Sequence, residues 1–155
     1  MRIYILALDE VFDTGLSTVL DTFSIANDLA GSAGTPSIHF EITVVGVRRR
    51  VHTSQGLWVP VRSAAELARP DIVLIPALGA KMPETLQVAL ERRDVADAGK
   101  LLRQWSDGGV LVSAACTGTF VLANPFFRDW QSATTSWWLA PCFRSRYSPS
   151  LLDEA

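Results

Sequence analysis

Short apolar runs, separated by polar and turn-forming segments, recur along the chain. Each run is apolar at nearly every position and too short for a helix, which is typical of a strand buried on both faces of a parallel sheet. The pattern predicts strands at residues 2–8, 38–47, 71–75 and 110–114. A further stretch, residues 51–61, is interrupted by turn-forming residues and predicts a small hairpin.

Between these strands, apolar residues recur at helical spacing. After the first strand such a stripe begins near Leu16 and ends at Gly31. Pro83 suits the first turn of a second helix, and a third helix carries Trp105 and ends at Gly108. Strands that alternate with helices predict an α/β domain whose sheet is mainly parallel, with helices on both faces.

The composition is that of one folded domain, residues 1–155. With 48% hydrophobic and 19% charged residues, the chain is too apolar to be disordered and long enough to bury a core. No apolar run approaches the ~18 residues of a membrane span, and the N-terminus lacks the features of a signal peptide. We therefore expect a cytoplasmic protein without a membrane partner. A net charge of −2 is not that of a nucleic-acid-binding surface.

The candidate chemistry lies where the predicted strands end. Sites in parallel sheets lie beyond the carboxyl ends of the strands, which brings together the loops after Leu8, around Gly79 and at Cys116. Cys116 stands between a strand and a helix, with the small residues Ala114 and Gly118 on either side, as in a nucleophile elbow. The start of the helix favours negative charge on the sulfur. A buried structural cysteine is the alternative.

The second cysteine, Cys142, is expected in the core. Two cysteines provide neither a disulfide framework nor a metal site, and we expect no cofactor.

A catalytic cysteine needs a base and a group that orients the base. The two histidines, His39 and His52, fall on a predicted strand and hairpin, so surface or packing roles are expected for them. Three acidic residues, Asp9, Glu10 and Asp13, follow the first strand in the loop that is expected near the elbow. Asp13 has a structural alternative, because it precedes a helix and can cap it.

Several segments resemble a known family. Residues 116–118 (Cys-Thr-Gly), 133–141 (Ala-Thr-Thr-Ser-Trp-Trp-Leu-Ala-Pro) and 143–147 are similar to the amidotransferase-like N-terminal domain of AraC-family transcriptional regulators of the GlxA type, in the DJ/PfpI superfamily. Residues 20–27 are similar to the first helix of that domain, and residues 76–79 to the loop that donates a backbone N–H opposite the cysteine. The resemblance implies a flavodoxin-like three-layer sandwich.

The departures from this family bear on catalysis. Enzymatic members carry an acidic residue in the opening turn of the first helix, where this sequence has Gly15. They also carry a histidine directly after the cysteine or in the later Thr-Thr-x-Trp region, where this sequence has Thr117 and Ser136. The resemblance therefore implies a non-catalytic pocket for an unknown small-molecule effector. The residues expected to line the pocket are Asp13, Gly15, Gly79, Cys116, Thr117, Gly118 and Ser136.

The resemblance also implies the organisation of a regulator. In that family another strand and helix close the domain, and a helix-turn-helix domain follows, neither of which this sequence contains. We therefore expect a sandwich truncated at its C-terminal end, an uncovered apolar patch, pairing into a homodimer, and contact with DNA only through the absent C-terminal domain. The alternatives are a purely structural dimerisation domain and a cysteine-dependent enzyme of the hydratase, amidase or deglycase-like kind.

Overall fold

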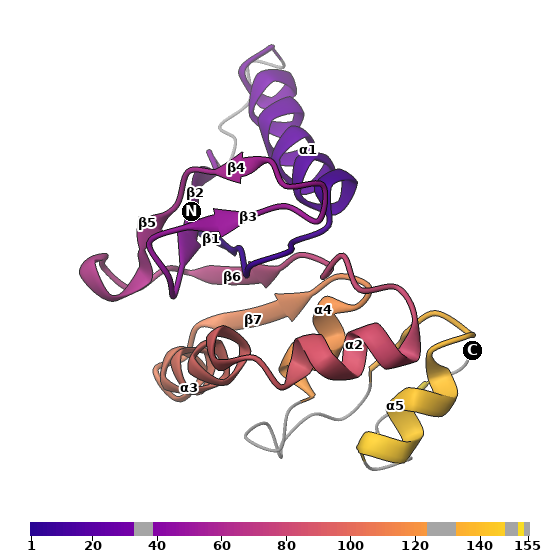
Figure 1. Cartoon of the computed structure of the whole chain (residues 1–155). Coiled ribbons are helices and arrows are strands. Elements are labelled where there is room, and N and C mark those ends of the chain that lie inside the picture. The colour runs from indigo at the N-terminus through magenta and orange to yellow at the C-terminus, as the bar shows by residue number, and fades with distance from the viewer. Residues whose placement is uncertain (33–38, 124–132, 148–151, 154–155) are drawn as a thin grey trace.

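The computed structural model describes residues 1–32, 39–123, 133–147 and 152–153. Its centre is a five-stranded sheet with the order β5-β2-β1-β6-β7, in which every neighbouring pair is parallel (Figure 1). The strands of this sheet are β1 (Arg2–Leu6), β2 (Glu41–Gly46), β5 (Arg62–Ser63), β6 (Ile72–Ile75) and β7 (Leu111–Ala114).

All four predicted strands are confirmed, each with shorter bounds than predicted. The first apolar run continues to Leu8, which is buried although it lies beyond the end of β1. Residue 38, the predicted start of the second strand, lies outside the described residues. The predicted hairpin is also confirmed, as β3 (Val51–His52) paired antiparallel with β4 (Trp58–Val59). The sequence did not predict β5, because two residues are too few to show a periodic pattern.

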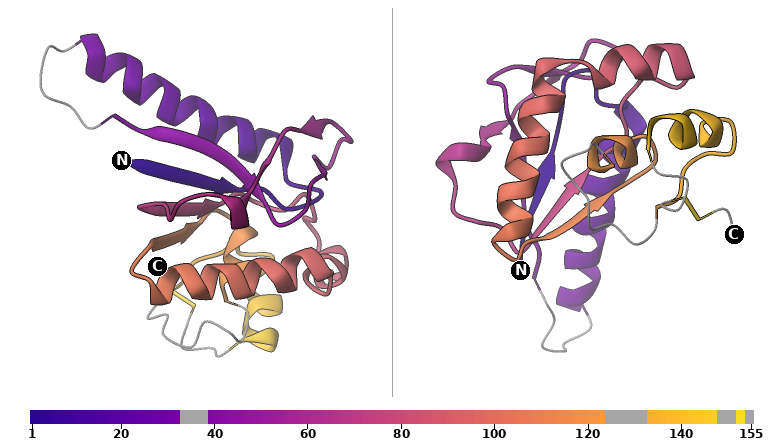
Figure 2. Two further views of the ribbon diagram at one scale, coloured as in Figure 1. Left: turned by 90° about the vertical axis from the view of Figure 1, so that its left-hand side faces the viewer. Right: turned by 90° about the horizontal axis from the view of Figure 1, so that it is seen from below.

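Helices cover both faces of the sheet, so the domain has three layers (Figures 1 and 2). One face carries α1 (Asp13–Ser32) beside the β3–β4 hairpin. The other carries α2 (Pro83–Leu90), α3 (Arg93–Asp107), α4 (Gly118–Leu122) and α5 (Ala140–Arg146), and a short 3-10 turn, η1 (Ala64–Glu66), follows β5. None of the helices in the described ranges has both the length and the apolar character that a membrane span requires.

The alternation of side chains along β1 divides the core in two. Ile3 and Ile5 are fully buried on the side of α1, in one cluster with Leu16. Tyr4 and Leu6 point to the opposite side, into the larger cluster beneath α2, α3, α4 and α5. Successive residues of a strand face opposite sides, so a strand buried on both faces must be apolar throughout.

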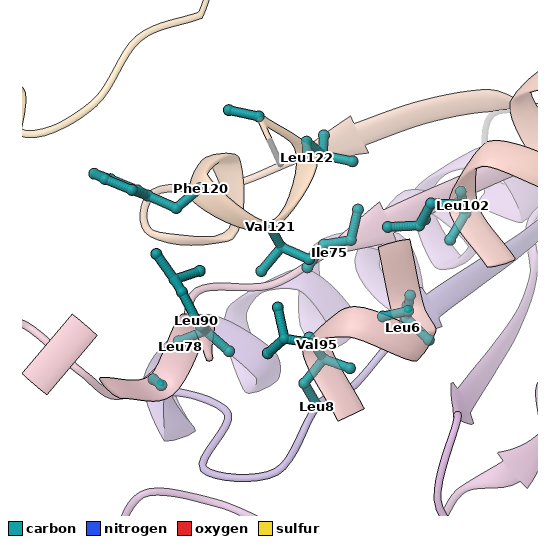
Figure 3. Close-up of a cluster of buried hydrophobic side chains, with 14 of the residues drawn as sticks. Leu6, Leu8, Ile75, Leu78, Leu90, Val95, Leu102, Phe120, Val121 and Leu122 are labelled. Carbon is teal, nitrogen blue, oxygen red and sulfur yellow. The ribbon is translucent and has the colours of Figure 1, made fainter. Parts of the chain in front are cut away.

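The larger core cluster anchors the short helix α4. Figure 3 shows Phe120, Val121 and Leu122 of this helix beside Ile75 of β6 and Val95 of α3, and all five are fully buried. A helix of five residues gains little from its own hydrogen bonds, so this burial is what holds α4 against the sheet.

An aromatic cluster attaches α5 to α4. The Phe120 and Phe143 rings pack edge to face with centroids 5.1 Å apart, and Tyr147 lies 4.8 Å from Phe143. The Tyr147 hydroxyl donates a 2.7 Å hydrogen bond to the Phe120 carbonyl. Burial raises the pKa of Tyr147, so its hydroxyl stays protonated and able to donate.

Some large apolar side chains are exposed to solvent. On β7, at one end of the sheet order, Leu111 is 63% exposed. On α1, Leu16 is the one buried residue, while Ile25 and Leu29 are more than half exposed. These exposed apolar side chains lie on two separate elements.

Candidate functional site at Cys116

The elbow is formed by the turn between β7 and α4. Cys116 lies two residues after the end of β7, with its side chain exposed and its backbone in the left-handed region, at φ 53°. A cysteine rarely adopts this conformation, which costs free energy and persists only where the surrounding structure enforces it. The next residues, Thr117 and Gly118, are buried. The geometry therefore agrees with a nucleophile elbow and not with the alternative of a buried structural cysteine.

Gly118 is required because α4 approaches the end of β6 very closely. A Cβ atom at this position would lie 2.6 Å from the carbonyl oxygen of Ile75 and 2.7 Å from that of Pro76. Both atoms belong to the backbone, so neither can move aside cheaply. Gly118, two residues after the cysteine, thus sets how closely α4 and Cys116 approach the sheet.

We expect Gly118→Ala to lower the free energy of unfolding by about 2–3 kcal/mol, since the added methyl group pushes α4 away from the sheet. Gly31→Ala is the matched control, because a Cβ there meets no atom within 4 Å. Alanine is the better helix former, so the control should be neutral or stabilising by up to about 1 kcal/mol. Urea denaturation followed by circular dichroism measures both variants. Equal effects would show that the close contact does not matter.

The three loops that the sequence analysis placed together do meet. The Thr117 hydroxyl donates a 2.9 Å hydrogen bond to the Leu78 carbonyl, which joins the elbow to the loop after β6. That loop is joined in turn to the loop after β1, by a bridge between Leu78 and Val11 and by a 2.8 Å hydrogen bond from the Phe12 N–H to the Ala77 carbonyl. The convergence at the carboxyl edge of the sheet is confirmed.

The loop around Gly79 is fixed against the loop after β1 by a backbone hydrogen bond. The Gly79 N–H donates a 2.7 Å hydrogen bond to the carbonyl of Glu10, and is therefore engaged within the protein. Glu10 itself has a left-handed backbone, at φ 56°. A Cβ at Gly79 would lie 2.2 Å from Cβ of Ser54, so glycine is needed here for close packing against the hairpin.

The acidic residues near the elbow have other partners. Asp9 accepts a 2.9 Å hydrogen bond from the His52 N–H, and Glu10 forms a 2.7 Å ion pair with Arg92. Arg92 also pairs with Asp94, at 3.1 Å, and donates to the Asp9 carbonyl, at 2.6 Å. Among the described residues, none forms a hydrogen bond with the sulfur of Cys116. The loop of these acidic residues does lie near the elbow, but their carboxylates bind other partners than the cysteine in the described part of the chain.

Asp13 connects α1 to the hairpin. Its Oδ2 accepts hydrogen bonds from the Ser54 hydroxyl, at 2.9 Å, and from the Gln55 N–H, at 3.3 Å. Asp13 is the first residue of α1, and its carboxylate binds the hairpin turn instead of capping the helix as the sequence alternative proposed. The neighbouring Thr53 hydroxyl, followed by these two bonds, lowers the pKa of the Asp13 carboxyl more than desolvation raises it, so the group is ionised at neutral pH.

The two positions that lack the family's catalytic groups lie in the same region of the fold. A Cβ at Gly15 would lie 3.6 Å from Cβ of Ala77, on the loop that contacts Thr117 through Leu78. Ser136 precedes α5, and its carbonyl accepts a 2.8 Å hydrogen bond from the Leu139 N–H. The nearby Trp138 indole donates a 3.0 Å hydrogen bond to the Lys81 carbonyl, which ties this segment to the loop after β6.

The two histidines are not joined to the cysteine. The His39 carbonyl accepts a hydrogen bond from the N-terminal amine, at the opposite end of β1 from the elbow. His52 lies 3.5 Å from the Asp9 carboxylate, at the carboxyl end of β1. His52 was not predicted at this edge of the sheet, because a two-residue strand leaves its register open.

Arg92 and Trp138 shape the site, and neither was predicted from the sequence to do so. Arg92 ties α3 to the loop after β1, and Trp138 ties the segment before α5 to the loop after β6. Arg92 gives no sequence signal, since an arginine beside an aspartate is common on surfaces. Trp138 lies in the run that carries the family resemblance, which was the one available indication. Both cysteines are free, and the described residues contain no group of three side chains that could hold a metal ion.

No family model and no curated protein matches the sequence. Solved structures do match. An AraC family transcriptional regulator from Pseudomonas putida is 17% identical, with a TM-score of 0.74 over 99% of this chain and 76% of that chain. DJ-1beta from Drosophila melanogaster is 20% identical, with a TM-score of 0.68 over 99% of this chain and 74% of that chain. The chain has a DJ-1/PfpI-type fold.

Other matches extend this result. A DJ-1 superfamily protein from Agrobacterium tumefaciens is 18% identical, with a TM-score of 0.63 over 100% of this chain and 74% of that chain. The DJ-1/PfpI-type fold, which is class I glutamine amidotransferase-like, confirms the flavodoxin-like α/β sandwich expected from the sequence. Regulator domains are among the proteins that share this fold, and so are DJ-1 proteins. At these identities the likeness defines the fold alone.

Proposed function

We propose that this chain is the non-catalytic, effector-sensing domain of a transcriptional regulator of the AraC family, GlxA type. The observation that carries the proposal is an elbow cysteine kept in its strained conformation while the surrounding carboxylates are bound elsewhere. Cysteine catalysis needs a base within hydrogen-bond reach, and general acid–base help contributes about 10²–10⁴-fold. The likeness to the Pseudomonas putida regulator supports this function class.

The effector pocket would lie above the elbow. The exposed sulfur of Cys116 forms its floor, and the loops after β1 and β6 form its walls, since they are joined to the elbow through Thr117 and Leu78. Gly15 and Ser136 stand where the enzymes carry acid and histidine, so this pocket would lack catalytic side chains at both positions. DNA would be contacted by a separate domain, in keeping with the net charge of −2.

The two thiols should differ in reactivity. Cys116 is exposed at the start of α4, whereas Cys142 is partly buried in α5 against the core. We expect iodoacetamide to alkylate Cys116 several-fold faster, because access to the sulfur is open there. Mass spectrometry of time-quenched samples measures both rates, with Cys116→Ser and Cys142→Ser to assign the peaks. Equal labelling of the two thiols would contradict the geometry of the elbow.

The same labelling reaction tests sensing. A panel of small carboxylic acids, amides and amino acids is screened for compounds that slow the alkylation of Cys116 and raise the melting temperature. The proposed function requires at least one compound that protects Cys116 from alkylation in a saturable way and that the protein does not convert chemically. A panel without any protector would favour the purely structural dimerisation domain.

A cysteine-dependent enzyme is the second candidate, and the positive φ of Cys116 favours it, since backbone strain collects at catalytic nucleophiles. Its test is turnover of methylglyoxal, an aryl amide and an isonitrile. We expect no turnover above the Cys116→Ala background. Turnover that depends on Cys116 would make the enzyme the better assignment.

We also propose that the domain forms a homodimer through the β7 edge of the sheet, where Leu111 is 63% exposed. An apolar side chain on an end strand favours association, and a lysine there opposes it. Leu111→Lys should therefore shift the mass in light scattering from the dimer toward the 16.9 kDa monomer. Val88→Lys, on α2 at 68% exposure, is the control and should leave the dimer intact. A wild-type chain that is monomeric would refute the proposal.

A further inference from the structure

A pocket of about 590 Å³ lies where β2 ends, and none of the elbow residues 116–118 lines it. Gly46, the last residue of β2, pairs with Ser63 of β5, and both residues line the pocket. Ligands of open α/β sheets bind beyond the carboxyl ends of the strands, and their sites usually measure about 300–1,000 Å³. The place and the size of this pocket therefore suit a small molecule.

Two arginines of the turn after β2 line the pocket, and they differ in their partners. The Arg48 guanidinium donates a 2.7 Å hydrogen bond to Asp97 and a 3.1 Å hydrogen bond to the carbonyl of Val47. The bond from Arg48 is the main cause that lowers the pKa of Asp97, so this carboxylate is ionised and offsets the charge of Arg48. The Arg49 side chain is exposed and is bonded to no residue that the structure describes. Arg49 thus offers an unpaired guanidinium group to the pocket.

Glu66 supplies the opposite charge. It ends η1 and is exposed, and its carboxylate forms no ion pair or hydrogen bond within the described ranges. Ser63 precedes η1, and its hydroxyl makes no capping hydrogen bond to that turn. Arg49 and Glu66 line the same pocket without pairing with each other. A guanidinium, a carboxylate and a hydroxyl group are therefore all accessible to a ligand.

An unpaired cation and an unpaired anion in one pocket select a ligand that carries both charges. A guanidinium group binds a carboxylate through two parallel N–H···O bonds, and a carboxylate accepts hydrogen bonds from an ammonium group. Glu66 would repel a ligand that is only anionic, and Arg49 one that is only cationic. An α-amino acid has both groups on one carbon atom. Val47 and Val61 also line the pocket and suit an apolar side chain.

We propose that the pocket at the end of β2 binds a free α-amino acid with an apolar side chain. The ligand carboxylate lies against Arg49 and the Ser63 hydroxyl, and its ammonium group lies against Glu66. The apolar side chain lies between Val47 and Val61. This site is separate from the one at Cys116 and does not rest on the proposed function.

NMR titration of the isotope-labelled protein with three matched probes tests the proposal: L-leucine, N-acetyl-L-leucine and L-leucinamide. At about pH 6.5, where α-amino groups are protonated, leucine should bind with a Kd in the millimolar range or below and shift the amides of residues 46–49 and 63–66. N-acetyl-leucine lacks the ammonium group and leucinamide lacks the carboxylate. Each should bind at least about tenfold more weakly, because a hydrogen bond to a charged group is lost.

Three results of this titration would overturn the site. One is the absence of leucine binding. Another is N-acetyl-leucine that binds as well as leucine, because Arg49 would then hold any anion. The third is a set of shifts centred on residues 116–118, because the amino acid would then occupy the elbow.

Variants of the two charged residues locate the binding. Arg49→Leu and Glu66→Gln should each weaken leucine by about tenfold or more. The controls are Arg62→Leu, at an exposed position of β5 that does not line the pocket, and Glu84→Gln, at an exposed position of α2, and both should leave the affinity unchanged. All four positions are exposed, so the melting temperature should stay that of the wild type. Unchanged leucine affinity in both pocket variants would refute the proposal.

Discussion

Phe120→Ala should lower the free energy of unfolding by about 3–5 kcal/mol, the usual cost of removing a fully buried phenylalanine. The ring is completely buried and packs against Phe143 and Tyr147, so its loss leaves a cavity between α4, α5 and the sheet. The Tyr147 hydroxyl bonds to the backbone of residue 120 and cannot fill the space by moving inward without breaking that bond. Since the free energy of unfolding of small domains is about 5–15 kcal/mol, this substitution removes a large share of it.

Urea unfolding monitored by circular dichroism measures this loss. Leu29→Ala is the control, because Leu29 is 65% exposed on α1 and its truncation should change stability by no more than about 0.5 kcal/mol. The same samples report on the elbow, since Cys116 lies two residues before α4. Faster alkylation of Cys116 in Phe120→Ala than in the wild type is expected. A loss below about 1 kcal/mol would mean that α4 and α5 are not anchored by the aromatic cluster.

Arg92→Leu should lower the free energy of unfolding by about 3 kcal/mol, because breaking a largely buried ion pair leaves the partner charge uncompensated. Arg92 is 22% exposed and binds Asp94, whose side chain is only 9% exposed. The same guanidinium group pairs with the Glu10 carboxylate and donates to the Asp9 carbonyl. The backbone carbonyl of Glu10 in turn accepts a hydrogen bond from the Gly79 N–H. The variant therefore loosens the loops beside the elbow as well.

Arg93→Leu is the matched control for this variant. Arg93 is the next residue along the chain and is exposed, so the same substitution should change stability by no more than about 0.5 kcal/mol. Thermal unfolding of the two variants, with amide hydrogen exchange of residues 9–11 and 77–79, separates a global from a local effect. If exchange in both loops is unchanged, Arg92 is not a positioning residue of the site.

The elbow could be predicted from residue types because its causes are local. A tight turn between strand and helix accepts only small neighbours, which the residue types around Cys116 show. The contact that excludes a Cβ at Gly118, with the carbonyl oxygens of Ile75 and Pro76, is not local and is seen only in the structure. The positions of the strands were also predictable from local patterns. A strand buried on both faces has to be apolar at nearly every position, and β6 and most of β1 show such a run. β2 and β7 include Glu41, Thr43 and Ser113 and are less buried, but their remaining apolar residues still mark them as strands.

The partners of the charged residues could not be predicted. Glu10 and Arg92 are separated by 82 residues, and Asp13 and Ser54 by 41. Any of several carboxylates in the loop after β1 had the right chemistry to reach Cys116, and none of them does so among the described residues. Which pairs form depends on how closely the loops approach one another, a property that a pattern of residue types does not contain.

The sequence by itself determined the α/β class, the parallel strands and the elbow cysteine, because periodicity and small side chains act over a few neighbouring residues. Only the tertiary structure decided that the Gly79 N–H is bound to Glu10, that Asp13 joins α1 to the hairpin, and that Arg49 and Glu66 line the same pocket. These features arise where segments far apart in the chain pack together, and their geometry follows from the fit of whole elements.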